Sequence, residues 1–187
     1  MPYLNWKEEK IADESSETIN RMYNNGFVFT RIEKGVMQQT RSVRIDLTKF
    51  ELSSENRRIL RKGEDVMLEI HNIPFPKYTW EIGKIAKDFY DKKAPGSFSV
   101  NKIKEIITTE HNFNSLFVYG NTGYCIAYQD SEMLHYCYPF YDLDKSPKDM
   151  GLIMMTKAIA EAQMKGYRYV YLGSLQRPSD IYKLQFS

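Results

Sequence analysis

The amino-acid sequence predicts an α/β fold of the α+β kind, with a mixed, largely antiparallel sheet flanked by helices. Three strand patterns joined by short turns between residues 116 and 141 indicate an antiparallel meander. A long helical pattern and one more strand pattern follow, up to residue 173. The chain has 187 residues, of which 42% are hydrophobic and 27% charged, which is enough for one well-filled core. We therefore expect a single domain of residues 1–187.

The composition excludes several classes of protein. Fourteen Tyr and ten Phe residues with a formal net charge of +2 exclude a disordered chain. The apolar stretches fall far short of the ~18 residues of a membrane span, and the polar residues 1–10 are unlike a signal peptide. The only cysteines, Cys125 and Cys137, form neither a disulfide framework nor a metal-ligand spacing. We expect a cytoplasmic protein that does not contact a membrane and holds no metal.

The first part of the chain is predicted to alternate helices with strands. The expected elements are, in order, a helix over 17–24, strands over 27–32 and 36–47 that form a hairpin and its continuation, a helix from Ser53 or Ser54 through Lys62, a strand over 66–70, and helices over 77–91 and 100–108. A glycine follows each of the first two helices, where it can cap the helix end. In the second strand, alternation turns Val43, Ile45 and Leu47 toward the core. Arg44 therefore points outward.

Residues 114–187 give the clearest pattern. Strands are expected over 116–119, 124–128 and 133–141, followed by a long helix that starts at Pro147 and ends at Gly166, and by a strand over 167–173. The free N–H groups at the start of this helix suit a phosphate or a carboxylate. Lys145, Lys148 and Gly151 favour such a site. Asp149 in the first turn opposes it, because a carboxylate competes for the same N–H groups.

Charge is unevenly distributed, with a basic part in residues 1–64. Residues 31–62 hold nine basic and four acidic side chains, a net charge of +5. Six of the nine arginines of the chain lie there, but only three of its seventeen lysines. Arginine presents a planar fork that matches phosphate oxygens. Phosphate binding and a solvated helix face beside a hairpin are equally compatible with this window.

Two further groups of residues have both a chemical and a structural interpretation. A tyrosine-rich region suits stacking on a base or a sugar, although Tyr is also a common strand residue. Its members are Tyr136, Tyr138, Tyr141, Tyr169, Tyr171 and Tyr182. His135 and Cys137 lie two apart on one strand and so share a face. This spacing allows a thiol–imidazole nucleophile, but it arises easily by accident, and the sequence indicates no third group to orient the imidazole.

Several short segments occur in a definite order along most of the chain. They are Pro2-Tyr3-Leu4, Ser42-Val43-Arg44-Ile45-Asp46, Ser53-Ser54-Glu55-Asn56-Arg57-Arg58-Ile59-Leu60, Tyr138-Pro139-Phe140-Tyr141-Asp142, Met150-Gly151-Leu152, the stretch from Gly166 to Gly173, and Tyr182-Lys183. Their order and spacing resemble the arginyl-tRNA–protein transferase family, in particular its short bacterial aspartate/glutamate leucyltransferases. The resemblance implies a GNAT-like fold, with residues 114–187 as its acyltransferase-like core.

The resemblance also implies a reaction. The α-amine of an acceptor protein with an acidic N-terminal residue attacks the ester of an aminoacyl-tRNA that carries Leu or Arg. The products are a peptide bond and free tRNA, and no cofactor is needed. The reaction requires a neutral amine, correct positioning and hydrogen-bond donors for the oxyanion.

Candidate site residues follow from this reaction. Asp142 would orient or deprotonate the α-ammonium, Tyr182 would donate a hydrogen bond, and Lys183 would face a phosphate. The residues expected to hold tRNA phosphates or the acidic acceptor are Arg41, Arg44, Arg57, Arg58 and Arg61, and further binding residues are Tyr138, Tyr141, Gly151 and Tyr171. We expect the arginines to converge with the tyrosine-lined end of the sheet in one cleft.

Two other functions remain open on the sequence alone. The first is a GNAT N-acetyltransferase, which would place the pyrophosphate of acetyl-CoA at the helix that starts near Pro147; the glycine-rich loop expected there is absent. The second is a non-catalytic module of the same fold that binds tRNA or a degron. The oligomeric state does not follow from the sequence.

Overall fold

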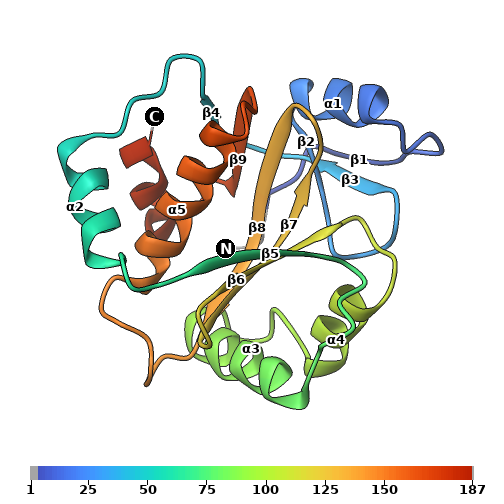
Figure 1. Ribbon diagram of the computed structural model, residues 1–187. Coiled ribbons are helices and arrows are strands. Elements are labelled where there is room, and N and C mark those ends of the chain that lie inside the picture. The colour runs from blue at the N-terminus through green and yellow to red at the C-terminus, as the bar shows by residue number, and fades with distance from the viewer. Residues whose placement is uncertain (1–3, 187) are drawn as a thin grey trace.

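The computed structural model describes residues 4–186, which form two sheets and six helices (Figure 1). The strands are β1 (Lys7–Lys10), β2 (Phe27–Phe29), β3 (Val36–Gln39), β4 (Ser42–Asp46), β5 (Leu68–Asn72), β6 (Ser115–Tyr119), β7 (Gly123–Gln129), β8 (Met133–Tyr141) and β9 (Tyr169–Ser174). The helices are α1 (Ser16–Asn24), α2 (Ser54–Lys62), α3 (Trp80–Lys93), α4 (Val100–Thr108), α5 (Met150–Met164) and the 3-10 helix η1 (Pro178–Phe186). None of these helices has the length and apolar character needed to cross a membrane. Pro2 and Tyr3 of the motif at the start of the chain lie outside the described residues.

The larger sheet has six strands in the order β4-β9-β8-β7-β6-β5. All neighbouring strands are antiparallel except β8 and β9, which run parallel. The predicted mixed, largely antiparallel sheet is therefore confirmed, including the meander of β6, β7 and β8. The parallel pairing joins residues 133–135 to residues 169–171 and goes no further. Beyond this point β8 and β9 part.

The smaller sheet has the order β1-β3-β2, and its β2–β3 hairpin is the predicted one. The prediction of a single strand over 36–47 is wrong, because the chain crosses from one sheet to the other between β3 and β4. At the crossing, the N–H of Thr40 donates to the carbonyl oxygen of Gly26, and the carbonyl oxygen of Arg41 accepts from the N–H of Leu175. Alternation in β4 is as expected: Val43, Ile45 and Leu47 are buried and Arg44 is exposed.

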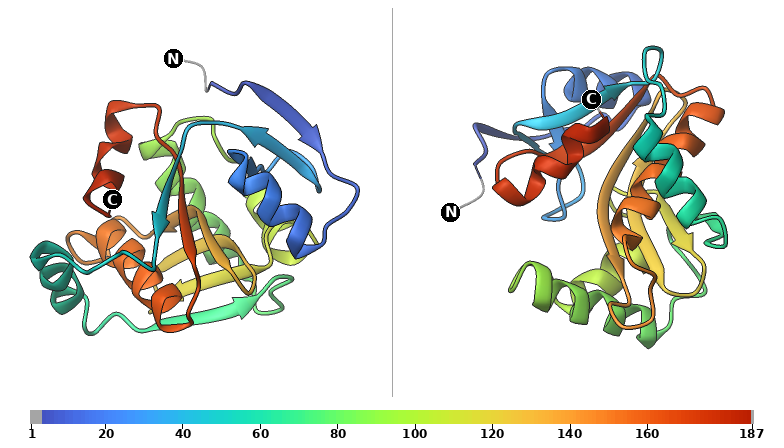
Figure 2. Two further views of the ribbon diagram at one scale, coloured as in Figure 1. Left: turned by 90° about the horizontal axis from the view of Figure 1, so that it is seen from above. Right: turned by 90° about the vertical axis from the view of Figure 1, so that its left-hand side faces the viewer.

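Helices cover both faces of the larger sheet (Figure 2). One face packs against α5 and the end of η1, through residues such as Ile159 and Phe186, and α2 lies on α5. The opposite face packs against α1, α3, α4 and the smaller sheet, through residues such as Met37, Ile103 and Phe140. The sheet therefore separates two apolar cores.

Helix ends follow local chemistry. Ser53 caps α2 in a capping box with Asn56, with both hydrogen bonds at 3.1 Å. The long helix α5 begins at Met150, three residues later than predicted from Pro147, and its N-cap Asp149 has a left-handed backbone with φ 69°. The predictions missed β1 and η1. The sequence of β1 is Lys-Glu-Glu-Lys, so it has no apolar alternation to reveal it.

Candidate functional site

A cleft of about 890 Å³ opens where β8 and β9 part. In the right-hand view of Figure 2, the smaller sheet and η1 lie above α3, and the larger sheet runs along one side of them. Five parts of the chain line the cleft. The smaller sheet and its hairpin supply Val28, Phe29, Thr30, Arg31, Ile32 and Gln38, and α3 with the loop after it supplies Phe89, Tyr90, Lys93, Ala94, Ser97 and Phe98. The others are Cys137, Tyr138, Pro139 and Tyr141 from β8, Asp149, Gly151, Leu152 and Met155 from the N-terminal end of α5 and the residue before it, and Ser174, Arg177, Ser179, Asp180 and Tyr182 from the C-terminal segment.

A β-bulge shapes the part of β8 that faces the cleft. The register against β7 shifts between the pairs Ile126–Tyr138 and Ala127–Tyr136, which leaves Cys137 as the extra residue on β8. A bulge interrupts the alternation of side chains along a strand. Three consecutive residues of β8, Cys137, Tyr138 and Pro139, line the cleft at this bulge.

Aromatic rings and cations alternate on the cleft walls. The aromatic residues are Phe29, Phe89, Tyr90, Phe98, Tyr138, Tyr141 and Tyr182. The guanidinium of Arg31 lies over the ring of Phe98, 4.4 Å from its centroid. Lys93 and Arg177 supply two further positive charges. No carboxylate of residues 4–186 forms an ion pair with any of these three cations.

Both carboxylates that line the cleft are already engaged. The carboxylate of Asp149 forms an ion pair with Lys62 on α2, with Nζ 2.8 Å from Oδ2. Oδ2 of Asp180 accepts from the backbone N–H groups of Gln176 and Arg177, at 3.0 and 2.9 Å. The charges left for a ligand in the cleft are therefore positive.

Lys183 lies on η1, next to the cleft, and its side chain reaches the end of β9. Its Nζ donates a 2.7 Å hydrogen bond to the carbonyl oxygen of Ser174. Burial lowers the pKa of Lys183, while the carboxylate of Asp180 acts in the opposite direction. A larger fraction of this amine is therefore neutral than in an exposed lysine. Gly173, with φ +73°, leaves room here: a side chain at its position would point between His135 Nε2 and Lys183 Nζ, at 3.9 and 4.0 Å.

His135 is buried beside Cys137 and held by Tyr23 from α1. The N–H of Phe29 donates to the hydroxyl of Tyr23, so this hydroxyl donates its own proton to His135 Nδ1, 2.7 Å away. The imidazole proton must then be on Nε2. Tyr23 is the orienting third group that the sequence did not indicate. It holds Nδ1 as an acceptor, and therefore occupies the nitrogen that a thiol–imidazole pair needs as its base.

The burial of His135 makes the stability of the fold depend on pH. Burial, with a smaller effect of the Lys183 charge, lowers the pKa of His135 to about 3. The unfolded chain takes up this proton near pH 6.5 and the folded chain does not. We therefore expect the free energy of unfolding to fall by up to about 1.4 kcal/mol per pH unit as the pH drops from about 6.5 toward 3. Urea unfolding of the wild-type protein and of His135→Gln at several pH values checks this, since a loss of equal slope in both proteins would contradict it.

The structure brings some of the predicted site residues together. Tyr138, Tyr141, Gly151 and Tyr182 line the cleft, and Lys183 lies next to it. Burial, together with the nearby Asp180, raises the pKa of Tyr182 to about 12, so its hydroxyl keeps its proton and can donate. Tyr171 is placed differently from the prediction.

Tyr171 is buried below the cleft. Its ring packs against that of Tyr23, with centroids 4.9 Å apart, at the last parallel pair of β8 and β9. It supports the site and does not line it.

The prediction that Asp142 acts on the substrate needs correction. Its Oδ1 accepts from the backbone N–H groups of Asp144 and Lys145, at 3.0 and 3.1 Å, so the carboxylate closes the turn after β8. Burial works to raise the pKa of Asp142, but these N–H groups and the charge of Lys145 outweigh it and lower the pKa. Asp142 is outside the lining of the cleft and is a poor proton acceptor at neutral pH.

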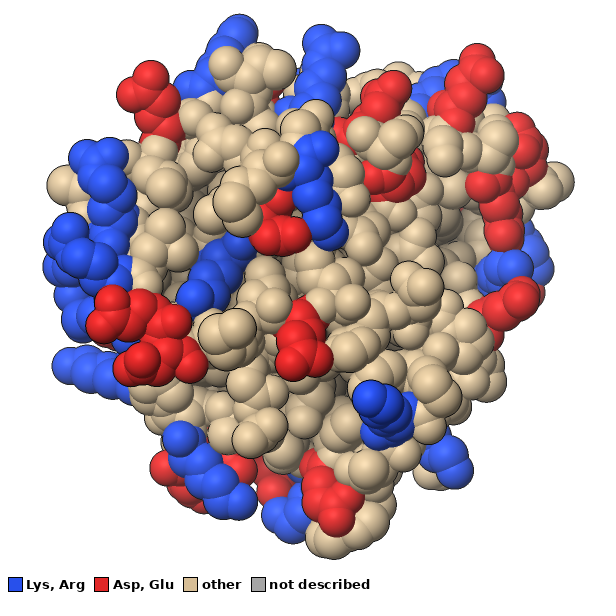
Figure 3. All heavy atoms as spheres, in the orientation of Figure 1, with Lys and Arg blue, Asp and Glu red and all other residues tan. Residues whose placement is uncertain are grey.

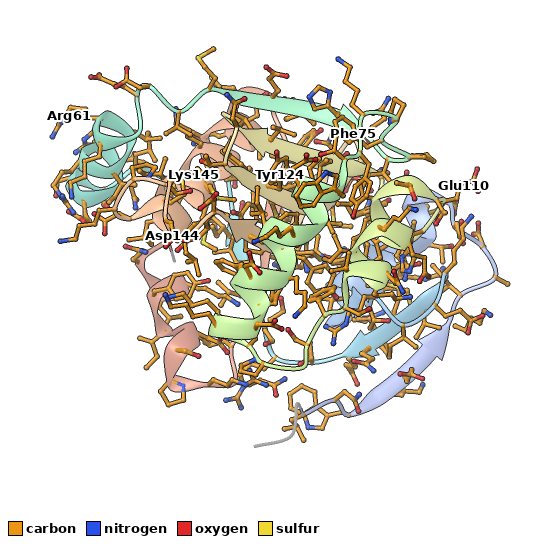
Figure 4. The ribbon with its side chains drawn as sticks, turned by 90° about the horizontal axis from the view of Figure 1, so that it is seen from below. Arg61, Phe75, Glu110, Tyr124, Asp144 and Lys145 are labelled. Atoms are coloured by element: carbon orange, nitrogen blue, oxygen red, sulfur yellow. The ribbon has the colours of Figure 1, made fainter. Side chains whose placement is uncertain are left out.

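The prediction that the five arginines converge with the tyrosine-lined end of the sheet in one cleft is also wrong, because none of them lines the cleft. Arg57, Arg58 and Arg61 lie on α2, which packs on α5 on the opposite face of the larger sheet. In Figure 3 basic side chains gather at the left edge, over α2, and Figure 4 shows Arg61 at the outer edge of the molecule. Arg58 is paired with Glu55 on its own helix, and Arg57 donates to the carbonyl oxygen of Leu52.

The two other predicted arginines also lie outside the cleft. Arg44 stacks on Tyr169 at 4.5 Å and donates to Asn24, and Arg41 is exposed at the crossing between the sheets. The cations that do line the cleft, Arg31, Lys93 and Arg177, come from three distant segments. They were missed because only the fold brings them together. The sequence signals that led to this site were Tyr138, Tyr141, Gly151 and the Tyr182-Lys183 pair.

The start of α5 is a weak anion site. The carboxylate of Asp149 occupies it together with Lys62, and Asp142 and Asp144 lie in the preceding turn. No metal site is evident either, because residues 4–186 contain no cluster of three His, Cys, Asp or Glu side chains suited to a metal ion.

The comparisons with known proteins give a likeness of fold only. No protein-family model matches this chain, and no curated protein matches it. Among solved structures, the C-terminal DUF2156 domain of a candidate lysylphosphatidylglycerol synthetase from Agrobacterium fabrum has a TM-score of 0.56 at 14% sequence identity. The match covers 92% of this chain and 55% of that chain, so the chain spans about half the length of this structure.

Two further structures match with a TM-score of 0.49 each. They are L-PGS from Bacillus licheniformis (13% identity, 92% of this chain and 58% of that one) and a GCN5-related glucosamine N-acetyltransferase region of a fungal multi-domain β-N-acetylglucosaminidase (11% identity, 94% and 22%). The chain shares the fold of the Agrobacterium domain, and the predicted mixed, largely antiparallel sheet flanked by helices is confirmed. The arginyl-tRNA–protein transferase family itself is not shown by these comparisons.

Proposed function

We propose that residues 1–187 form a single transferase domain that takes an aminoacyl group from the 3′ end of a charged tRNA and passes it to an acceptor in the cleft between β8 and β9. The observation that carries the proposal is the lining of this cleft: aromatic rings beside three cations that have no carboxylate partner within residues 4–186. Stacking surfaces with positive charge between them suit a single-stranded nucleic acid. The 3′ end of tRNA is single-stranded and brings the ester to the inner end of the cleft.

The chemistry assigned to the cleft is acyl transfer without a cofactor. The attacking group must lose a proton, and Lys183, whose pKa is lowered by burial, is the group assigned to accept it. Tyr182 keeps its proton and donates to the oxygen that becomes negative in the tetrahedral intermediate. These roles replace the predicted role of Asp142, and they move Lys183 from phosphate binding to proton transfer.

The acceptor must match the positive charge of the cleft. An acceptor protein with an acidic N-terminal residue fits the positive cleft, with Arg31 or Arg177 opposite its carboxylate. The Agrobacterium protein is named for a product in which lysine is joined to phosphatidylglycerol, so an anionic lipid is the alternative acceptor. Both acceptors carry a negative charge close to the attacking atom.

An N-acetyltransferase that uses acetyl-CoA is the second candidate for a GNAT-like fold. One observation speaks against it: the start of α5, where the pyrophosphate would bind, holds the carboxylate of Asp149 and its ion pair with Lys62. The third candidate is a non-catalytic module that binds tRNA or a degron. A binding module needs no proton acceptor, whereas the half-buried Lys183 beside the cleft has a lowered pKa, as a proton acceptor requires.

A transfer assay separates these functions. Purified protein is incubated with leucyl- or arginyl-tRNA labelled in the amino acid, and with three acceptors: a peptide that starts with Asp or Glu, the same peptide with an acetylated N-terminus, and phosphatidylglycerol vesicles. The proposal expects label in the free peptide or in the lipid and none in the blocked peptide. Binding of charged tRNA without transfer would leave the non-catalytic module. Acetyl-CoA should raise the melting temperature only of an acetyltransferase.

The cleft cations should set the salt dependence of RNA binding. For a short single-stranded RNA that ends in CCA, replacing both Arg31 and Arg177 with Gln is expected to reduce the slope of log K against log[salt] by about 1.4, because each phosphate contact on a single strand contributes about 0.7. Arg57→Gln with Arg58→Gln removes the same charge from α2 and should leave the slope unchanged. Fluorescence anisotropy at several salt concentrations measures both slopes, and a larger effect of the α2 pair would contradict the assignment.

A further inference from the structure

Two arginines lie on one tyrosine ring beside β4, the edge strand of the larger sheet. The guanidinium of Arg44 is 4.5 Å from the ring centroid of Tyr169, and that of Arg168 is 5.0 Å from the same centroid. Arg44 also donates a 3.1 Å hydrogen bond to the side chain of Asn24 on α1. These contacts hold the guanidiniums in place, so less freedom is lost when they bind a ligand.

Two further cations belong to the same surface. Arg21 is on α1, three residues before Asn24 and therefore on the same side of that helix. Lys49 lies in the turn after β4, where its N–H donates to the carbonyl oxygen of Asp46. The β4 basic surface consists of these four exposed residues: Arg21, Arg44, Lys49 and Arg168. No carboxylate of residues 4–186 forms an ion pair with any of them.

Two neighbouring carboxylates are bound within the fold. Oδ1 of Asp46 accepts from the N–H and the hydroxyl of the threonine two residues further on, at 3.1 and 2.6 Å. Oδ1 of Asp130 accepts from two backbone N–H groups in the turn before β8, at 2.8 and 2.9 Å. Exposed carboxylates remain on Glu17 of α1 and on Glu132, whose carbonyl oxygen accepts from the N–H of Arg168. The unpaired cations are therefore in the majority at this surface.

The β4 basic surface and the cleft lie on the same face of the larger sheet. Arg44 pairs with Tyr171 across β4 and β9, and Tyr169 and Tyr171 pack in the core that faces α1 and α3. The cleft residue Tyr138 packs in that core as well. Along β9, Tyr169 is five residues from Ser174 in the cleft, which is roughly 17 Å of extended strand. One RNA molecule can therefore contact both sites.

From these observations we infer that the β4 basic surface binds the double-stranded stem of the RNA whose single-stranded 3′ end enters the cleft. A duplex is too wide for a cleft of about 890 Å³, so the stem must lie outside it. Duplex RNA is contacted mainly through its phosphates and 2′-hydroxyl groups. Arginine forks match the oxygens of those phosphates. The inference rests on the proposed function for the identity of the RNA.

The same surface is poorly suited to a lipid bilayer. Binding to a bilayer surface needs buried apolar area in addition to positive charge. Among the described residues, none of the exposed large hydrophobic side chains belongs to α1, β4 or β9. Positive charge without apolar neighbours favours a nucleic acid.

Two RNAs test the inference: a hairpin whose stem ends in single-stranded CCA, and a short single strand that ends in CCA. Arg44→Gln with Arg168→Gln is expected to reduce the slope of log K against log[salt] for the hairpin by about 1.8, because each phosphate contact on a duplex contributes about 0.9. The slope for the single strand should stay the same. Fluorescence anisotropy at several salt concentrations measures both slopes, and melting curves establish that the variant is folded.

Two further variants separate charge from structure. Arg44→Lys with Arg168→Lys keeps both charges and should restore most of the hairpin slope. Arg57→Gln with Arg58→Gln removes the same charge from α2 and is the matched control, which should change neither slope.

The outcomes distinguish the inference from the proposed function. An unchanged hairpin slope in folded Arg44→Gln with Arg168→Gln would overturn the inference, and the cleft variants would still test the proposed function. An equal loss of slope for both RNAs would place these arginines on the 3′ end and overturn the stem contact. A wild-type protein that binds neither RNA would overturn both. Loss of binding to phosphatidylglycerol vesicles with an unchanged hairpin slope would assign the surface to a lipid.

Discussion

Replacing Lys183 with methionine is expected to lower the rate of aminoacyl transfer by about 100-fold or more, the usual contribution of a positioned general base. Methionine keeps much of the length and apolar volume of the side chain but accepts no proton. The hydrogen bond from Nζ to the carbonyl oxygen of Ser174 is lost as well, and the free energy of unfolding should fall by about 1 kcal/mol. Initial rates at saturating charged tRNA, with melting curves to establish folding, measure the effect.

The pH profile distinguishes this role from a structural one. Burial lowers the pKa of Lys183, so the amine becomes neutral at a lower pH than an ordinary lysine, and the wild-type rate should rise with pH through that pKa. Lys183→Met should lack this rise. Lys104→Met is the matched control, because Lys104 is exposed on α4 and lies outside the cleft. An unchanged profile in Lys183→Met would remove Lys183 from the reaction.

Replacing Phe140 with alanine is expected to destabilise the fold by about 3–5 kcal/mol, the range for a large aromatic residue deleted from a core. Phe140 is 0% exposed, and its ring stacks on that of Tyr124 with centroids 5.4 Å apart. It lies on β8 between the cleft residues Pro139 and Tyr141, so its loss removes apolar support directly behind the cleft.

Urea unfolding measures this loss, with Trp80→Ala as the matched aromatic control. Trp80 is 69% exposed at the start of α3 and should change the free energy of unfolding by less than about 0.5 kcal/mol. Equal effects of the two substitutions would contradict the packing described for β8.

Most elements of the fold could be predicted because their signals are local. The Ser53 cap and the following charged helix define α2 within one residue, and alternation places Val43 and Ile45 in the core. Turn residues separate β6, β7 and β8. The sheet that a strand joins depends on distant partners, so the crossing between β3 and β4 was missed.

The site was harder to predict because closeness along the chain differs from closeness in space. Of the six arginines that cluster in residues 31–62, three lie on α2, outside the cleft, and only Arg31 lines the cleft. The cleft cations Arg31, Lys93 and Arg177 have no common pattern in the sequence. Cys137 and His135 do share a face, but the role of Tyr23 depends on how α1 packs against β8.

The central claim is that the acyl group of a charged tRNA enters the cleft between β8 and β9, and a photocross-link tests it most directly. A tRNA charged with a photoreactive amino acid is bound to the protein, irradiated, and the attached residues are identified by mass spectrometry. The account predicts attachment to residues 137–141 of β8 or to residues 174–183, and little to α2. Cross-links concentrated on α2, away from the residues that line the cleft, would contradict it.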